Sequence, residues 1–231
     1  MAASSLDTLL QHPALWRGDQ LAQVAQPSLA SGFEALDREL PGGGWPVGAL
    51  TELLHEREGI GELRLLLPAL ARLTGAGRWV AWVAPPHLPY APALAAAGID
   101  LARLLVIGAV SPRDDLWAAE QALRAGSMGA VLFWPGELDA RAARRLQLAA
   151  EAGGAAGFLY RPLAAATEPS PAALRIALEP PSALRILKRR GRAASASIHL
   201  GLATPASPAA RQGGWARPGA SCRVSGQVQP A

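Results

Sequence analysis

The segment 55–62, HEREGIGE, holds the residue types that come nearest to phosphate chemistry. It lies between a strand-like run, 49–54, and a helical pattern that we expect to begin at Glu62. Backbone N–H groups at such a strand–turn–helix junction can bind phosphate oxygens. We therefore interpret Gly59, Gly61 and Glu62 as the position of a phosphate-binding loop.

The side chains around this loop do not suit a nucleotide. A working loop of this kind needs a lysine for the terminal phosphates and a serine or threonine for magnesium. Here Glu62 directly follows Gly61, Glu56 and Glu58 precede it, and the only lysine of the chain, Lys188, is far away in sequence. Because the carboxylates would repel a triphosphate, the sequence excludes a standard P-loop and predicts a degenerate one.

The neighbouring strands also lack the carboxylates of an NTPase, which activate water and order magnesium. The run 78–84 leads into Pro85 and Pro86, and the run 130–133 leads into Trp134 and Pro135. Glu137, two residues further on, is the nearest candidate to replace one of them. We therefore predict that the chain is not an enzyme and has no cofactor.

Metal and disulfide chemistry find no support in the sequence. The four histidines, at positions 12, 55, 87 and 199, have no metal-ligand spacing, and Cys222 is the only cysteine. No 18-residue apolar run occurs, and the first 20 residues do not resemble a signal peptide. We expect a cytoplasmic protein.

The elements that position these residues follow an alternating pattern. Between Arg78 and Arg161, short apolar runs alternate with helical patterns, which is typical of an α/β fold with a mostly parallel sheet flanked by helices. Ser111 and Asp139 are expected to cap two of the helices. The runs 173–179 and 182–190 predict antiparallel edge strands near the C-terminus, and 197–202 predicts one more strand.

The tryptophans divide into two groups. Trp79 and Trp82 lie on a predicted buried strand and Trp117 on an amphipathic helix, so we expect all three in the core. Trp45 lies in the glycine-rich turn PGGGWP, where it is either buried or exposed as an anchor.

Charge is distributed unevenly along the chain. The first 179 residues hold all 18 acidic and 14 basic residues, whereas the last 52 hold eight basic residues and no acidic one. We expect an N-terminal segment at 1–26, a core domain at 27–203 and a disordered basic tail at 204–231. The tail either serves solubility or binds an anionic partner, which is nucleic acid or an acidic protein face.

The candidate contacts for such a partner are cationic residues and one aromatic anchor near the C-terminus: Arg185, Lys188, Arg189, Arg190, Arg192, Arg211, Trp215 and Arg217. An edge strand protected by charge is the alternative interpretation of those at 185–190.

The order of these segments resembles the RecA-type recombinases. The run 31–54 is similar to the lead-in of their phosphate loop, and the likeness extends over about 27–192. Within that superfamily, HPALWRG at 12–18, GIGELRLLLPALARL at 59–73 and the missing catalytic residues resemble the ImuA family, which is associated with translesion DNA synthesis. The related SulA-like cell-division inhibitors share this resemblance.

The ImuA resemblance implies a RecA-like core without catalysis, a pseudo-ATPase. It also implies a role as adaptor in the damage-induced (SOS) mutagenic response, with an ImuB-type Y-family protein and the translesion polymerase assembly as partners and possible DNA contact through the basic C-terminal region. Lys188 and Arg190 fall on the paired lysines by which RecA reaches a neighbouring subunit's nucleotide.

Two alternatives belong to other classes of function. A SulA-like inhibitor would target the division GTPase instead of a polymerase. An NTPase with an atypical phosphate loop would use the backbone amides of Gly59 and Gly61, with Arg57 or Arg64 partly replacing the missing lysine.

Overall fold

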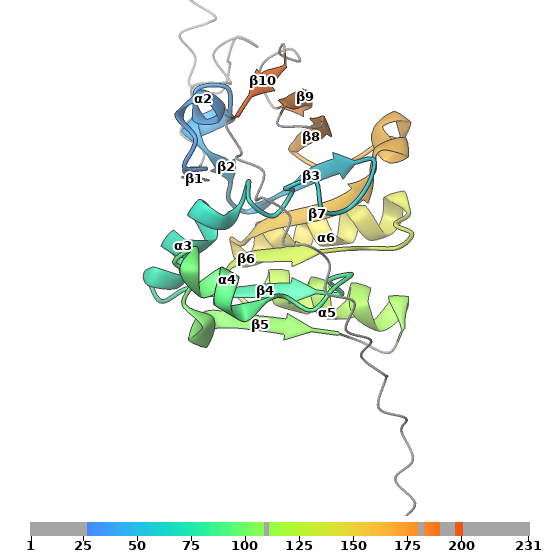
Figure 1. Ribbon diagram of the computed structural model, residues 1–231. Coiled ribbons are helices and arrows are strands. Elements are labelled where there is room, and N and C mark those ends of the chain that lie inside the picture. Colours follow the sequence, from blue (N-terminus) through green and yellow to red (C-terminus); the bar gives the residue numbers. More distant parts are fainter. Residues whose placement is uncertain (1–26, 109–110, 180–182, 190–196, 201–231) are drawn as a thin grey trace, which may run out of the picture.

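An eight-stranded sheet in the order β10-β9-β8-β3-β7-β6-β4-β5 forms the centre of the protein (Figure 1). The computed structural model describes residues 27–108, 111–179, 183–189 and 197–200. The strands of the sheet are β3 (Ala49–His55), β4 (Trp79–Val83), β5 (Leu104–Ile107), β6 (Met128–Phe133), β7 (Ala156–Pro162), β8 (Leu174–Glu179), β9 (Ala183–Arg189) and β10 (Ile198–His199). A separate two-stranded sheet joins β1 (Ser28–Leu29) to β2 (Trp45–Pro46).

The sheet is parallel from β5 to β8 and antiparallel beyond. β3 pairs in parallel with both β7 and β8, whereas β9 runs antiparallel to β8 and β10 antiparallel to β9. The predicted α/β class, the mostly parallel sheet and the antiparallel edge are therefore confirmed. The expected antiparallel pairing of 173–179 with 182–190 is confirmed, since β8 runs antiparallel to β9. The edge position expected for 173–179 is wrong, because β8 is an internal strand that pairs in parallel with β3 on its other side. The connection from β7 to β8 contains η4 (Leu163–Thr167). It leads the chain back to the end of the sheet at which the parallel strands begin.

Helices cover both faces of the sheet (Figure 1). On one face, α3 (Leu67–Gly75) and α4 (Ala91–Ala96) pack on a core that includes Trp82 and Phe158, together with the short elements α2 (Glu34–Asp37) and η2 (Pro41–Gly43). On the other face, α5 (Pro112–Arg124) and α6 (Ala140–Gly153) pack on a second core. η3 (Leu101–Arg103) leads into β5.

The helices α5 and α6 begin where the sequence predicts. The Ser111 hydroxyl accepts the Asp114 N–H at 3.3 Å, and the Asp139 carboxylate accepts the Ala142 N–H at 2.6 Å. These side chains satisfy donors that the first turn of a helix leaves free. At the other end of α6, Gly154 takes a left-handed conformation with φ of 66°.

The helix after the glycine loop begins later than predicted. The sequence predicts a start at Glu62, but α3 begins at Leu67, with Pro68 in its first turn. Proline lacks an N–H group and is tolerated only at the beginning of a helix, so the helix starts next to Pro68. As a result, the glycine loop does not lie directly at a helix N-terminus.

Two of the three predicted core tryptophans are partly exposed. Trp82 is buried, at 1% exposure, but Trp79 is 36% and Trp117 62% exposed. Trp79 lies at the beginning of β4, where the Arg103 guanidinium covers its ring at 5.3 Å. Trp117 lies on the side of α5 opposite its buried positions. Trp45, for which the sequence left two options, is fully buried.

The predicted N-terminal segment and basic tail, 1–26 and 204–231, lie outside the described residues. Among the helices that are described, none is long and apolar enough to cross a membrane.

Candidate functional site

The glycine loop after β3 binds one of its own carboxylates. Gly59 and Gly61 adopt left-handed conformations, with φ of 76° and 101°. The Gly59 N–H donates to Oε1 of Glu62 at 2.9 Å. An amide that could face a phosphate is therefore already occupied by an anion of the chain. The other oxygen of Glu62, Oε2, is buried and makes no hydrogen bond to any described residue.

A pocket of about 300 Å³, which we call the aromatic pocket, opens beside this loop at the carboxyl ends of β4 and β6. Its walls combine the carboxylates of Glu58 and Glu62 with the rings of Trp82, Tyr90 and Trp134. The carboxyl ends of parallel strands are the usual place for ligands in open α/β sheets.

The rings of the pocket continue into the core. Trp134 stacks on Tyr160, with ring centroids 4.5 Å apart and planes 4° from parallel. The ring centroid of Trp82 lies 5.8 Å from that of Trp134. His55, at the end of β3, lies 6.3 Å from Tyr160. Burial, and secondarily the Glu62 carboxylate, raise the pKa of Tyr160 well above its usual value of 10.0. Tyr160 is therefore a neutral phenol at physiological pH.

Four buried polar atoms in this region have no hydrogen-bond partner in the described part of the chain. They are Trp82 Nε1, His55 Nδ1, Tyr160 Oη and Glu62 Oε2. Such atoms are rare in folded proteins, because each costs the free energy of its lost hydration. Because all four atoms lie around one set of rings, this region of the sheet is the candidate functional site.

The rim of the pocket is exposed and largely apolar. Leu88 and Tyr90, in the segment that follows β4, are 91% and 73% exposed. His87 Nε2 lies 3.4 Å from Oε2 of Glu58. Exposed side chains of this size, next to a pocket, are typical of a binding surface.

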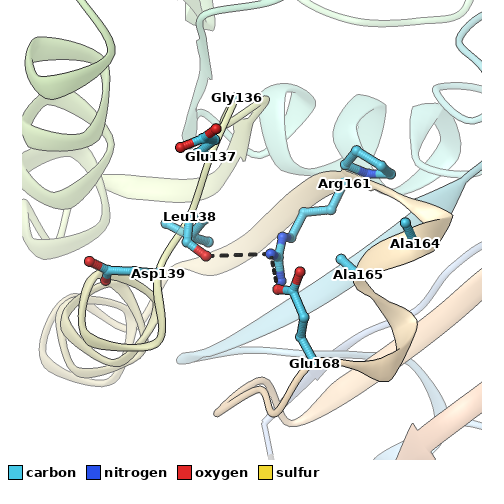
Figure 2. Close-up of a pocket in the computed structure, with 9 residues that line it drawn as sticks. Gly136, Glu137, Leu138, Asp139, Arg161, Ala164, Ala165 and Glu168 are labelled. Carbon is cyan, nitrogen blue, oxygen red and sulfur yellow. Dashed lines mark hydrogen bonds and ion pairs between the residues drawn. The ribbon is translucent and has the colours of Figure 1, made fainter.

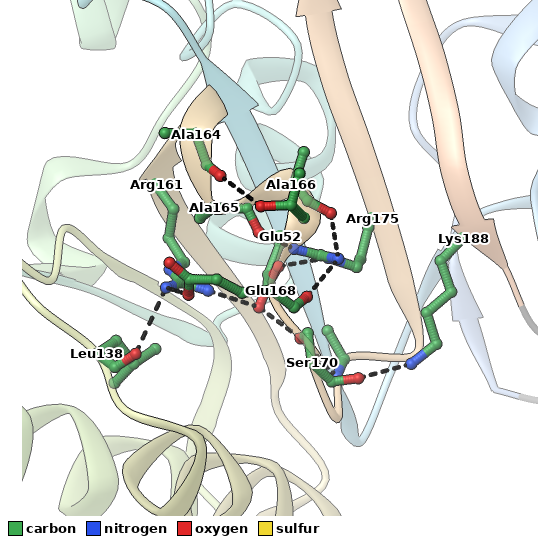
Figure 3. Close-up of polar contacts among 12 residues, drawn as sticks. Glu52, Leu138, Arg161, Ala164, Ala165, Ala166, Glu168, Ser170, Arg175 and Lys188 are labelled. Atoms are coloured by element: carbon green, nitrogen blue, oxygen red, sulfur yellow. Dashed lines mark hydrogen bonds and ion pairs between the residues drawn. The ribbon is translucent and has the colours of Figure 1, made fainter.

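A cluster of charges lies on the other face of the sheet (Figure 3). Glu52, fully buried in β3, accepts hydrogen bonds from Arg175 Nε at 2.6 Å, Ser170 Oγ at 2.5 Å and Arg161 Nη1 at 3.4 Å. Arg175 also donates to the carbonyls of Ala165, Ala166 and Glu168. These hydrogen bonds connect η4 and the residues that follow it, up to Ser170, to the strands of the sheet.

This cluster was missed by the sequence analysis, although a signal exists. Glu52, Arg161 and Arg175 are single charged residues inside the apolar runs ALTELL, FLYRP and ALRIALE. A charge in a strand that is buried on both faces requires a partner of opposite charge.

A second cavity, of about 640 Å³, opens next to Arg161 (Figure 2). The guanidinium donates to Glu168 Oε2 at 2.7 Å and to the Leu138 carbonyl at 3.4 Å. Glu137, the sequence candidate to replace a catalytic carboxylate, lines this cavity and not the aromatic pocket. The structure therefore does not bring Glu137 to the glycine loop.

The described cations among the predicted partner contacts are engaged within the protein. Arg185 pairs with Glu179 at 2.7 Å, and Arg189 pairs with Glu39 at 2.8 Å. Lys188 Nζ donates to the Ser170 carbonyl at 2.8 Å. Their role as contacts stays a prediction, and Arg190, Arg192, Arg211, Trp215 and Arg217 lie outside the described residues.

Comparisons with known proteins point to one family. The family model described as "Cell division inhibitor SulA" matches residues 48–157. The cell division inhibitor SulA of Serratia marcescens is 32% identical over 115 residues, which cover 50% of this chain and 68% of the relative. That of Pectobacterium atrosepticum is 31% identical over 140 residues, covering 60% and 74%. The crystal structure of SulA from Pseudomonas aeruginosa is 30% identical and covers 48% of this chain and 97% of its own, with a TM-score of 0.41.

These matches overturn the main hypothesis from the sequence. The adaptor role in translesion synthesis and the partners inferred with it, an ImuB-type protein, the polymerase assembly and DNA, are wrong, because the similar proteins are cell division inhibitors. The ImuA assignment fails for the same reason, whereas the SulA-like resemblance is confirmed.

Proposed function

The chain belongs to the SulA family, and we propose that it inhibits cell division by binding the division GTPase, without acting as an enzyme. The observation that carries this proposal is the match to named cell division inhibitors over about two thirds or more of their length. The cytoplasmic location expected from the sequence agrees with this family.

The matched range includes the features that a binding protein would use. Residues 48–157 contain the glycine loop, the segment after β4 and every residue that lines the aromatic pocket. The hydrogen bond from the Gly59 N–H to Glu62 supports a role without nucleotide, because a carboxylate holds the position that a phosphate would need.

Three finer points belong to the same proposal. A RecA-like core is supported by the position of the glycine loop, which follows the internal parallel strand β3. We place the inhibitor in the DNA-damage response, as the resemblance to SulA-like proteins implies. We also propose that residues 27–203 form the inhibitory domain and that 1–26 and 204–231 are accessory.

The experiment is induced expression of the chain in growing bacteria, with cell length and division septa as readouts. We expect long cells without septa, and the division GTPase should co-purify with the tagged chain. The Glu34→Gln variant changes only an exposed pair with Arg38 and should act like the wild type. Cells of normal length at equal expression, with no division GTPase recovered, would contradict the proposal.

A further inference from the structure

The aromatic pocket holds two carboxylates, and among its described lining residues His87 is the one side chain that can carry a positive charge. Glu58 and Glu62 line it, and among its described lining residues none is lysine or arginine. Glu62 is nine-tenths buried, and its Oε2 has no hydrogen-bond partner in the described chain. A buried carboxylate oxygen that lacks a donor is costly, and a charged donor from outside would remove that cost.

The walls of the pocket fit the same kind of group. Trp82, Trp134 and Tyr90 present aromatic rings, and the face of such a ring attracts a cation. One face of Trp134 is already covered by the parallel ring of Tyr160, which holds the indole in a fixed orientation. Rigid rings beside a carboxylate favour a planar cation that can stack and donate hydrogen bonds at the same time.

The size and surroundings of the pocket limit the ligand further. A volume of about 300 Å³ lies at the lower end of ligand sites, so the pocket suits one side chain better than a nucleotide. Leu88 and Tyr90 at the rim offer apolar surface to the residues around that side chain. The Glu58 carboxylate already contacts His87. The carboxylate left to accept a hydrogen bond from a ligand is therefore that of Glu62.

We propose that the aromatic pocket binds the guanidinium group of an arginine that a protein partner presents. The group would stack against the indole wall and donate to Glu62, while the rim contacts the neighbouring residues of the partner. No comparison assigns a ligand to this pocket, and the proposal holds whichever protein supplies the arginine.

The probe for this proposal is N-acetyl-arginine amide, with N-acetyl-citrulline amide as a neutral probe of the same shape. The full chain is labelled with ¹⁵N in its tryptophans, and the indole N–H signals of Trp82 and Trp134 are assigned with Trp→Phe variants. We expect saturable shifts of these two signals at millimolar arginine probe, and at least tenfold weaker binding of the citrulline probe.

Variants identify the carboxylate that acts. Glu62→Gln removes the charge but keeps an oxygen that can accept the Gly59 N–H, and it should weaken binding of the arginine probe about tenfold. Glu137→Gln, at the other cavity, is the matched control and should bind like the wild type. Thermal unfolding checks that each variant is folded, and Glu58→Gln at the rim replaces Glu62→Gln if that variant is not.

The proposal is overturned if arginine and citrulline probes bind equally, if the wild type gives no saturable shift, or if neither Glu62→Gln nor Glu58→Gln weakens binding. The assay contains no division GTPase. Failure of the pocket proposal and failure of the proposed function can therefore be told apart.

Discussion

The carboxylate of Glu52 lies in the middle of an apolar strand and accepts hydrogen bonds from two guanidinium groups. Arg175 and Arg161 come from the strands on either side of β3, so the three charges join β7, β3 and β8. Buried charges are stable only when each has a partner, and removing one member leaves the others uncompensated. The cluster is therefore a structural device of the sheet.

We expect Glu52→Gln to lower the free energy of unfolding by about 3–5 kcal/mol, because both arginines lose the charge that compensates them. Urea unfolding measures this loss. Glu34→Gln, which breaks an exposed pair with Arg38, should change the free energy by about 0.5 kcal/mol or less. Equal effects of the two variants would contradict a structural role for the buried cluster.

Tyr160 makes stability sensitive to alkaline pH. Its pKa is raised in the folded protein, whereas in the unfolded chain it is about 10. Above pH 10 the unfolded chain releases this proton and the folded protein keeps it, so the free energy of unfolding falls as the pH rises. At lower pH the contribution of this group is constant.

Tyr160→Phe should therefore flatten the decline of stability between about pH 9 and 11. At pH 7 we expect little loss, because the hydroxyl has no hydrogen-bond partner among the described residues and the ring contact with Trp134 can remain. Tyr90→Phe is the matched control, because it removes a tyrosine hydroxyl from the exposed rim and not from the core. Identical profiles for Tyr160→Phe and wild type would exclude this explanation.

At the scale of elements, the contact between α5 and α6 depends on a glycine. A Cβ atom on Gly153 would meet the Leu123 carbonyl oxygen closer than any real Cβ contact and would lie 2.9 Å from the Arg124 carbonyl carbon. The end of α6 can approach the end of α5 only because this residue has no side chain.

Gly153→Ala should therefore lower the free energy of unfolding by about 1–3 kcal/mol, through the strain of overpacking. Gly136→Ala is the matched control, because nothing lies within 4 Å of the added Cβ, and it should change stability by about 0.5 kcal/mol or less. Thermal unfolding of both variants measures the difference. Equal melting temperatures would show that α6 can shift without cost.

Elements with local signals were predictable, and elements set by packing were not. The Ser111 and Asp139 caps depend on neighbouring residues alone, so α5 and α6 begin as predicted. The predicted start of α3 was wrong because the apolar pattern of the sequence continues across the turn before Pro68. The edge position expected for β8 was wrong because its second neighbour, β3, comes from a distant part of the chain.

In the candidate site, too, features set by neighbouring residues were predictable and features set by packing were not. The sequence located the glycine loop and its carboxylates, because these residues are contiguous. It did not locate the pocket, since the walls come from three separate segments that only the parallel sheet brings together. The exposure of Trp117 was also missed, because the helical pattern did not identify which face of α5 packs on the sheet.

For the whole molecule, the alternating pattern predicted the fold class but not the family. The resemblance on which the assignment depended covered the ImuA family and the related SulA-like inhibitors alike, so it could not separate an ImuA-type adaptor from a SulA-type inhibitor. The matches to named inhibitors made that distinction.

The proposed function also predicts that the chain does not bind nucleotide. Titration with magnesium-ATP or magnesium-GTP should give no binding heat, because Glu62 occupies the Gly59 amide and its charge repels phosphate. Isothermal titration calorimetry measures this directly. Saturable binding of either nucleotide would return the atypical NTPase to consideration.

The most direct test of the central claim is sedimentation of purified division GTPase polymers in the presence of the purified chain. We predict that the amount of polymer in the pellet falls in proportion to the chain added, as expected for an inhibitor that acts by binding. Unchanged polymer at a molar excess of folded chain, or its complete loss at a trace amount, would contradict inhibition by binding.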